Sequence, residues 1–135
     1  MKKYICLLFV FLFVALVPFS VSAIGTMTRT NNVYSADTRF TISDGGDATI
    51  TLSYEGYPNI TTGATISVKI EKRVLFAFWD EVVSRTFTVT GEQYYTSLIY
   101  QLDKKGTYKC TVEYVISGAG GADDVITYEA EQKYE

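Results

Sequence analysis

Carboxylates are the side chains of this chain that could do chemistry. In glycoside hydrolysis, one carboxyl group protonates the leaving group while a second attacks the sugar or activates water. The acids considered for such a pair are Glu55, Asp80, Glu81 and Glu92. Their spacing sets no pair apart, and a chain of 135 residues leaves little room for a substrate cleft. The sequence also contains no histidine, which excludes Ser-His-Asp and Cys-His catalysis and histidine-based zinc sites in this chain. We therefore predict a non-catalytic protein without a cofactor, and a small secreted hydrolase is the weaker alternative.

Two pairs of aspartates resemble the oxygen-rich loops that bind calcium. Asp44 and Asp47 flank two glycines, and Asp123 and Asp124 follow a glycine-rich stretch. The strand pattern described below places these pairs at opposite ends of the domain, so they cannot form one site together. The first pair is also a favourable turn sequence by itself. We predict no metal site.

The segment Val74–Trp79 contains six consecutive apolar residues. A strand with one buried face alternates apolar and polar residues, so some side chains of this run must face solvent, a partner or a lipid surface. One interpretation is a strand packed on both faces, with Trp79 in the core. The other is an exposed contact surface of the aromatic type that dominates interfaces, formed by Leu75, Phe76, Phe78 and Trp79.

A second candidate binding surface lies in the predicted loops. Tyr57, Pro58 and Asn59 separate two predicted strands, and tyrosine, asparagine and glycine are favoured in binding loops. The glycine-rich segment 118–121 should emerge at the same end of a sandwich. These are also ordinary loop residues. We keep Tyr57 and Asn59 as candidate binding residues beside the apolar run.

The elements that must position these residues are strands. Apolar and polar residues alternate with a period of two, and turn sequences rich in glycine and aspartate separate the segments. The alternating segments are 40–42, 48–54, 64–70, 86–90, 98–102, 108–116 and 125–130. This pattern predicts an all-β domain, an antiparallel immunoglobulin-like sandwich of about seven strands. Its inward tyrosines need partners for their hydroxyl groups.

Residues 1–23 have the pattern of a cleaved secretory signal peptide. Two lysines precede an apolar run over 5–17, and Val21-Ser22-Ala23 has the small-x-small form that signal peptidase accepts. The run is shorter than the roughly 20 residues of a spanning helix, and Pro18 ends it. We expect a mature domain over 24–135 without a stable membrane anchor, free outside the cell or loosely held on its surface.

Removal of this segment would leave one cysteine, Cys110, and a charge more negative than the −3 of the full chain. One cysteine cannot form an intramolecular disulfide, so we predict that it is a small buried hydrophobe; the alternative is a bond to another chain. The negative charge disfavours a basic patch for nucleic acid or anionic membrane. The expected partner is an extracellular protein or glycan, and the sequence leaves the oligomeric state open.

The segment Leu102–Cys110 contains Gly-Thr-Tyr-x-Cys after an acidic turn and resembles the entry to strand F of immunoglobulin-like domains. This resemblance implies a corner hydrogen bond from the Tyr108 hydroxyl and suggests Trp79 as the core tryptophan. The cysteine that pairs with strand F in that family has no counterpart in segment 48–54.

Five short segments carry a second resemblance, and they are Phe78-Trp79-Asp80, Gly106-Thr107-Tyr108, Gly118–Gly121, Ile126-Thr127-Tyr128 and Lys133-Tyr134. In this order they resemble a group of small secreted immunoglobulin-like proteins of Gram-positive, gut-type bacteria. That family has no assigned activity, so the resemblance implies export and fold but no functional residues. We predict a secreted interaction module; the alternative is a structural surface protein that assembles by pairing of strand edges.

Overall fold

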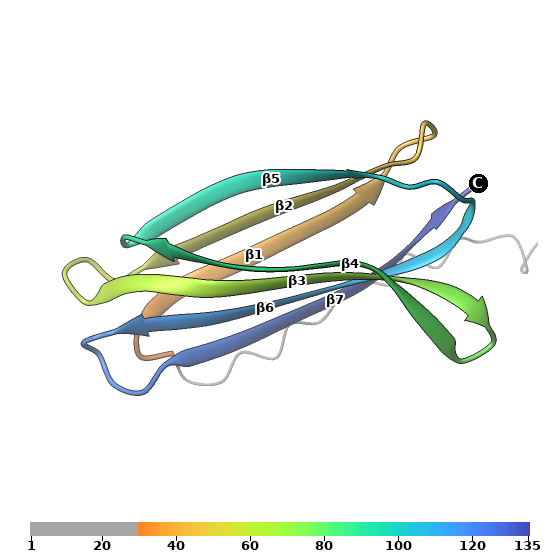
Figure 1. The fold of residues 1–135 in the computed structure, drawn as a ribbon. Coiled ribbons are helices and arrows are strands. Elements are labelled where there is room, and N and C mark those ends of the chain that lie inside the picture. Colours follow the sequence, from red (N-terminus) through yellow and green to blue (C-terminus); the bar gives the residue numbers. More distant parts are fainter. Residues whose placement is uncertain (1–29) are drawn as a thin grey trace, which may run out of the picture.

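The computed structural model describes residues 30–135, which form a β-sandwich of two antiparallel sheets (Figure 1). Sheet A contains, in spatial order, β1 (Val33–Ile42), β2 (Asp47–Gly56) and β5 (Gln93–Gln101). Sheet B contains, in spatial order, β4 (Phe78–Thr90), β3 (Thr61–Leu75), β6 (Gly106–Gly118) and β7 (Asp124–Tyr134). The predicted seven-stranded sandwich is confirmed. The predicted signal peptide over 1–23 lies outside the described residues.

The period of two places one face of each central strand in the core. Ile50 and Leu52 of β2 are buried, as are Ile66, Val68 and Ile70 of β3, and the residues that alternate with them point outward. The buried apolar set is Val33, Phe40, Ala48, Ile50, Leu52, Tyr54, Ala64, Ile66, Val68, Ile70, Leu102, Tyr108, Cys110, Val112, Tyr114, Ile116 and Ile126. Within residues 30–135, no helix is long and apolar enough to cross a membrane.

The buried tyrosines Tyr54, Tyr108 and Tyr114 find hydroxyl partners, as predicted, whereas the buried hydroxyl group of Tyr100 has none within residues 30–135. The hydroxyl of Tyr108 donates to the carbonyl oxygen of Lys104, four residues upstream, which is the corner hydrogen bond implied by the immunoglobulin resemblance. The hydroxyl of Tyr114 bonds to Thr38 Oγ1 at 2.6 Å and donates to the carbonyl oxygen of Asp37 at 3.0 Å. These bonds offset the cost of burying a phenol.

Cys110 is a buried hydrophobe, as predicted. It is a free thiol with no exposed surface, on the inward face of β6. Burial raises the pKa of the thiol to about 12. Because the thiolate is the reactive form, this cysteine is chemically inert at neutral pH in the folded protein.

The strands β4 and β5 are consecutive in the chain but belong to different sheets. The crossing uses Gly91, whose φ of 113° favours glycine and whose amide donates to the carbonyl oxygen of Thr62 at 2.9 Å. Inward side chains on both strands, such as Phe87 and Leu98, are only partly buried. The sandwich is therefore open along the side between β4 and β5.

Candidate functional site

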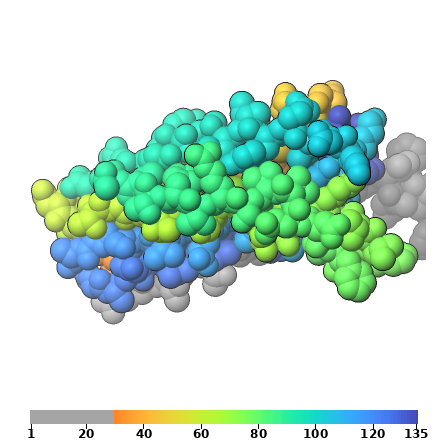
Figure 2. Space-filling view, in the orientation of Figure 1, coloured from red at the N-terminus to blue at the C-terminus, as the bar shows by residue number. Residues whose placement is uncertain are grey.

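The hairpin that joins β3 to β4 extends beyond the rest of the sandwich (Figure 1). The pairing of β3 with β6 ends at Lys72 and Tyr108, so the last part of β3 has only β4 beside it. Four apolar side chains at its end form what we call the apolar tip: Val74, Leu75, Phe76 and Phe78. Figure 2 shows the end of this hairpin protruding from the body of the molecule.

The apolar tip is exposed to solvent. Phe76 is fully exposed, and Leu75 and Phe78 are 63% and 67% exposed. The interpretation of this run as a strand packed on both faces is therefore wrong, because the two-stranded ribbon has no sheet to pack against. Leu75, Phe76 and Phe78, three of the four residues predicted to form an exposed surface, lie together at this tip.

Trp79, the fourth predicted member of that surface, lies below the tip on the outer face of sheet B. The register pairs it with Arg73, and the guanidinium carbon of Arg73 is 4.7 Å from the centre of the indole ring. The ammonium nitrogen of Lys109 is also 4.7 Å from the ring centre. Two cations therefore contact one indole, an arrangement favoured by the ring quadrupole.

The expectation that Trp79 is the core tryptophan is wrong, and a β-bulge is the reason. Val83 faces inward opposite Ile70, so simple alternation would turn Trp79 inward as well. The register shifts after this pair, and Glu71 pairs with Glu81, which leaves Val82 as the extra residue. Because of this shift, the residues of β4 before Val82 point to the opposite faces of the sheet from those that simple alternation predicts. The indole of Trp79 therefore lies on the outer face of sheet B.

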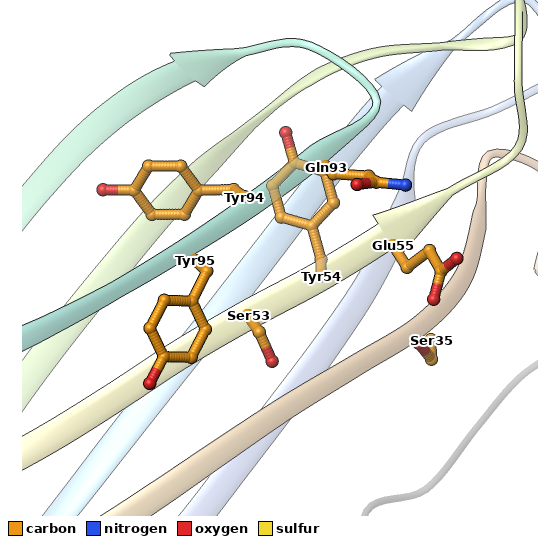
Figure 3. A pocket seen from close by; sticks show the side chains of 7 residues that line it. All are labelled: Ser35, Ser53, Tyr54, Glu55, Gln93, Tyr94 and Tyr95. Atoms are coloured by element: carbon orange, nitrogen blue, oxygen red, sulfur yellow. The ribbon is translucent and has the colours of Figure 1, made fainter.

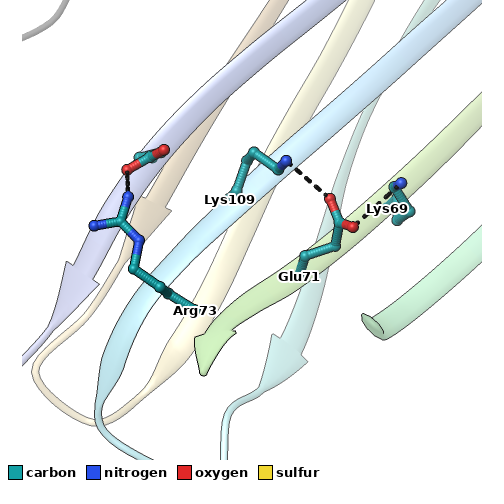
Figure 4. Close-up of polar contacts among 5 residues, drawn as sticks. Lys69, Glu71, Arg73 and Lys109 are labelled. Carbon is teal, nitrogen blue, oxygen red and sulfur yellow. Dashed lines mark hydrogen bonds and ion pairs between the residues drawn. The ribbon is translucent and has the colours of Figure 1, made fainter. Parts of the chain in front are cut away.

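Each of the two cations also forms an ion pair with a carboxylate (Figure 4). Arg73 Nη2 lies 2.8 Å from Glu131 Oε2, and the carboxylate of Glu71 lies 3.3 Å from Lys109 Nζ and 3.4 Å from Lys69 Nζ. Desolvation by burial acts to raise the pKa of Glu71, but the hydrogen bonds from Lys109 and Lys69 outweigh it and lower the pKa. The base of the apolar tip is thus a cluster of paired charges around one indole.

The other two candidate residues lie at the opposite end of β3. Tyr57 and Asn59 belong to the loop between β2 and β3, and the amide of Ala119 in the β6–β7 loop donates to the carbonyl oxygen of Ile60 at 2.9 Å. The prediction that these two loops lie together is confirmed, and we call this the loop end. Tyr57 is half-buried with its ring 6.3 Å from that of Tyr34. The six candidate residues therefore do not form one site.

The loop end is held together by a buried polar network that the sequence analysis missed. The carboxylate of Asp124 accepts hydrogen bonds from the backbone amides of Asn31, Asn32 and Val33, at 2.6 to 3.0 Å. The side chain of Asn32 donates to the carbonyl oxygen of Ala122 at 2.9 Å and accepts from the amide of Gly120 at 3.0 Å. These bonds attach the start of β1 to the β6–β7 loop. They also occupy the oxygens of Asp124 that a cation would need.

The remaining carboxylates are not gathered into a site. A hollow of about 460 Å³ on sheet A is lined by Ser35, Ser53, Tyr54, Glu55, Gln93, Tyr94 and Tyr95 (Figure 3). It contains one acid, Glu55, whereas Glu92 accepts a hydrogen bond from the amide of Asn59. The acids Asp80 and Glu81 lie at the far end of β4. Asp44 and Asp47 belong to the tight β1–β2 turn, and within residues 30–135 no group of three or more acidic or cysteine side chains is placed to hold a metal ion.

A scan against protein-family models finds no match to this chain, and no curated protein matches its sequence.

Proposed function

We propose that this protein is an exported, non-catalytic binding module whose apolar tip inserts into an apolar pocket of a partner protein. The observation that carries the proposal is the complete exposure of Phe76, flanked by two other largely exposed apolar side chains. Exposed aromatic anchors of this kind supply most of the binding energy at protein interfaces. The N-terminal signal pattern and the resemblance to small secreted sandwich proteins support export.

The chemistry of the tip favours a protein over a glycan. Residues 74–78 carry no hydroxyl, amide or charged side chain. A sugar presents many hydroxyl groups, and a site that takes it needs polar side chains placed to bond them. A hydrophobic pocket makes no such demand and gains from desolvating leucine and phenylalanine.

The base of the tip supports binding at low entropic cost. The cations of Arg73 and Lys109 stack on Trp79, and their carboxylate partners hold both in place. A ribbon fixed in this way loses less conformational freedom on binding than a flexible loop would. Trp79 is thus proposed as a positioning residue, and the direct contacts come from Leu75, Phe76 and Phe78.

Photocrosslinking tests the proposal. A benzophenone amino acid replaces Phe76 in one variant and Thr41, an exposed residue of β1, in the control. When the chain meets the surface and culture proteins of its own organism, we expect a specific protein adduct from position 76 and none from position 41. With that partner purified, Phe76→Ser should weaken binding by about tenfold or more.

A lipid surface is the competing partner of the tip. Sedimentation with phosphatidylcholine vesicles distinguishes a lipid from a protein partner. We expect the chain to remain in the supernatant when such vesicles are sedimented. Phe76-dependent sedimentation with the vesicles, without a protein adduct from position 76, would overturn the protein-binding proposal.

A further inference from the structure

Four strands of the sandwich lie at sheet edges, and three of them carry devices that discourage pairing with another chain. An edge strand exposes a row of unpaired N–H and C=O groups, which charges, bulges and covering segments protect. β4 has the bulge at Val82 and the inward-pointing Arg85. β7 carries Glu129, Glu131 and Lys133. β1 carries Asp37 and Arg39, and Asp124 binds its start to β7.

β5 has none of these devices. Its sequence, Gln-Tyr-Tyr-Thr-Ser-Leu-Ile-Tyr-Gln, contains no charged residue, proline or glycine. Its pairing with β2 runs without a bulge from Gln93 to Gln101. On the outer face Tyr95 is 74% exposed and Ile99 is 65% exposed. A straight, uncharged edge rich in aromatic and β-branched residues is the type that accepts another strand.

The backbone groups available at this edge can be assigned. At one end of β5 the amide of Leu102 donates to Gly46, and at the other the carbonyl oxygen of Glu92 accepts from the amide of Gly56, both toward β2. Backbone groups of successive strand residues point alternately to the two sides. The backbone N–H and C=O groups of the even-numbered residues of β5 therefore point toward β2. The N–H and C=O groups at positions 93, 95, 97, 99 and 101 face the free edge.

The edge is complementary to itself in the antiparallel sense. About a two-fold axis through Ser97, each residue of β5 meets a chemically suitable partner from a second copy: Gln93 with Gln101, Tyr94 with Tyr100, Tyr95 with Ile99, and Thr96 with Leu98. Aromatic pairs and aromatic–β-branched pairs are favourable cross-strand neighbours, and no like charges oppose each other. This register also keeps outward residues beside outward residues. The two copies of Ser97 lie opposite each other and exchange two backbone hydrogen bonds.

We propose that β5 pairs with β5 of a second copy of this chain, centred on Ser97, so that two A sheets join into one. The two-fold contact uses the same edge of both copies, so the assembly closes at a dimer and does not grow into a polymer. Inward side chains along the open side, such as Tyr94 and Leu98, lie next to the new contact and would lose exposed surface. A contact of one strand per copy is small, and the association is therefore weak and dependent on concentration.

Sedimentation equilibrium of the purified full chain, from about 10 to about 500 µM, tests the association. We expect a monomer–dimer equilibrium. Ser97→Lys places two ammonium groups opposite each other and should raise the dimer dissociation constant by about tenfold or more. Thr41→Lys adds the same charge to an exposed residue on the opposite edge of sheet A and should leave the constant unchanged. A monomer throughout this range, or a dimer unaffected by Ser97→Lys, would overturn the proposal.

Disulfide trapping tests the register. In a Cys6→Ser chain the remaining cysteine, Cys110, is buried. Ser97→Cys then places two thiols across the axis at a Cα separation of about 5.5 Å, which suits a disulfide. Ile99→Cys is the matched control, because its two copies lie about 13 Å apart along the strands. We expect rapid oxidation to a linked dimer only for Ser97→Cys; equal linking of both variants would contradict this register.

Discussion

The two ends of the sandwich differ in the side chains that they bury and expose: the loop end buries polar residues, and the other end exposes apolar ones. At the loop end, Asn32 and Asp124 are buried, and the chain itself occupies their hydrogen-bonding groups. At the other end, Leu75 and Phe76 are exposed, and the hairpin that carries them has no sheet behind it. Burial of polar groups is costly unless they are bonded, and exposure of apolar groups forgoes their contribution to folding.

This difference agrees with a structural role for the loop end and with the binding role proposed for the apolar tip. The polar residues of the loop end have a structural explanation, since their hydrogen bonds attach the start of β1, in sheet A, to β7 and the β6–β7 loop of sheet B. The apolar tip has no such explanation, because its side chains contribute nothing to the core. Stability measurements on the two ends can therefore support or break the assignment of binding to the tip.

The largest loss of stability is expected from Asp124→Ala. The change leaves three backbone amides of residues 31–33 without their carboxylate, at a buried site. We expect a loss of about 3 kcal/mol in the free energy of unfolding, measured by urea denaturation. Asp123→Ala, on the exposed neighbour, should change it by less than about 0.5 kcal/mol. If the two variants were equally stable, the polar network would not be what holds the loop end.

A smaller loss is expected from Tyr108→Phe, at the end of the sandwich that carries the tip. The variant keeps the buried ring and removes the hydroxyl that bonds the carbonyl oxygen of Lys104. The expected cost is about 1 to 2 kcal/mol, read from the same urea titration. Tyr34→Phe, at an exposed ring, is the control and should be neutral. A neutral Tyr108→Phe would mean that the corner bond does not stabilise this end.

The strands, and the apolar run as a break in their pattern, could be predicted because both follow from local sequence. Alternation along β2 and β6 reports directly on which face is buried, and the six apolar residues from Val74 onward break that alternation visibly. A local break cannot decide between burial and exposure. That choice depends on where the pairing of β3 with β6 stops, which no short segment encodes.

Trp79 and the loop-end network were missed for two other reasons. The bulge at Val82 reverses the facing of the indole, and two adjacent valines give no signal of which one is the extra residue. Asn32 and Asp124 are 92 residues apart, and their pairing exists only after both sheets have formed. An aspartate beside a glycine-rich turn is equally typical of a plain loop.

A still smaller effect, dependent on pH, is expected from Glu71→Gln beneath the tip. The pKa of Glu71 is lowered in the folded protein, so its ion pairs stabilise the fold above the ordinary glutamate pKa, and this stabilisation is lost as the pH falls through the lowered value. Urea titrations at neutral and acidic pH should show a loss of about 0.5 kcal/mol for the variant at neutral pH, and no loss in acid. Glu113→Gln, on an exposed residue of β6, should behave as wild type at both. A difference between Glu71→Gln and wild type that persisted unchanged in acid would contradict this account.

The smallest effect on stability, and the most informative, is expected from Phe76→Ser. A fully exposed side chain that contacts no core residue contributes nothing to the folded state, so the free energy of unfolding should change by less than about 0.5 kcal/mol. The same substitution at the buried Phe40 should cost more than about 3 kcal/mol, because it opens a cavity and buries a hydroxyl group. If Phe76→Ser destabilised the fold as Phe40→Ser does, the tip would belong to the core and its assignment to binding would fail. If it leaves the fold intact while the photocrosslinked partner is lost, the two ends of the sandwich differ in role as their burial predicts.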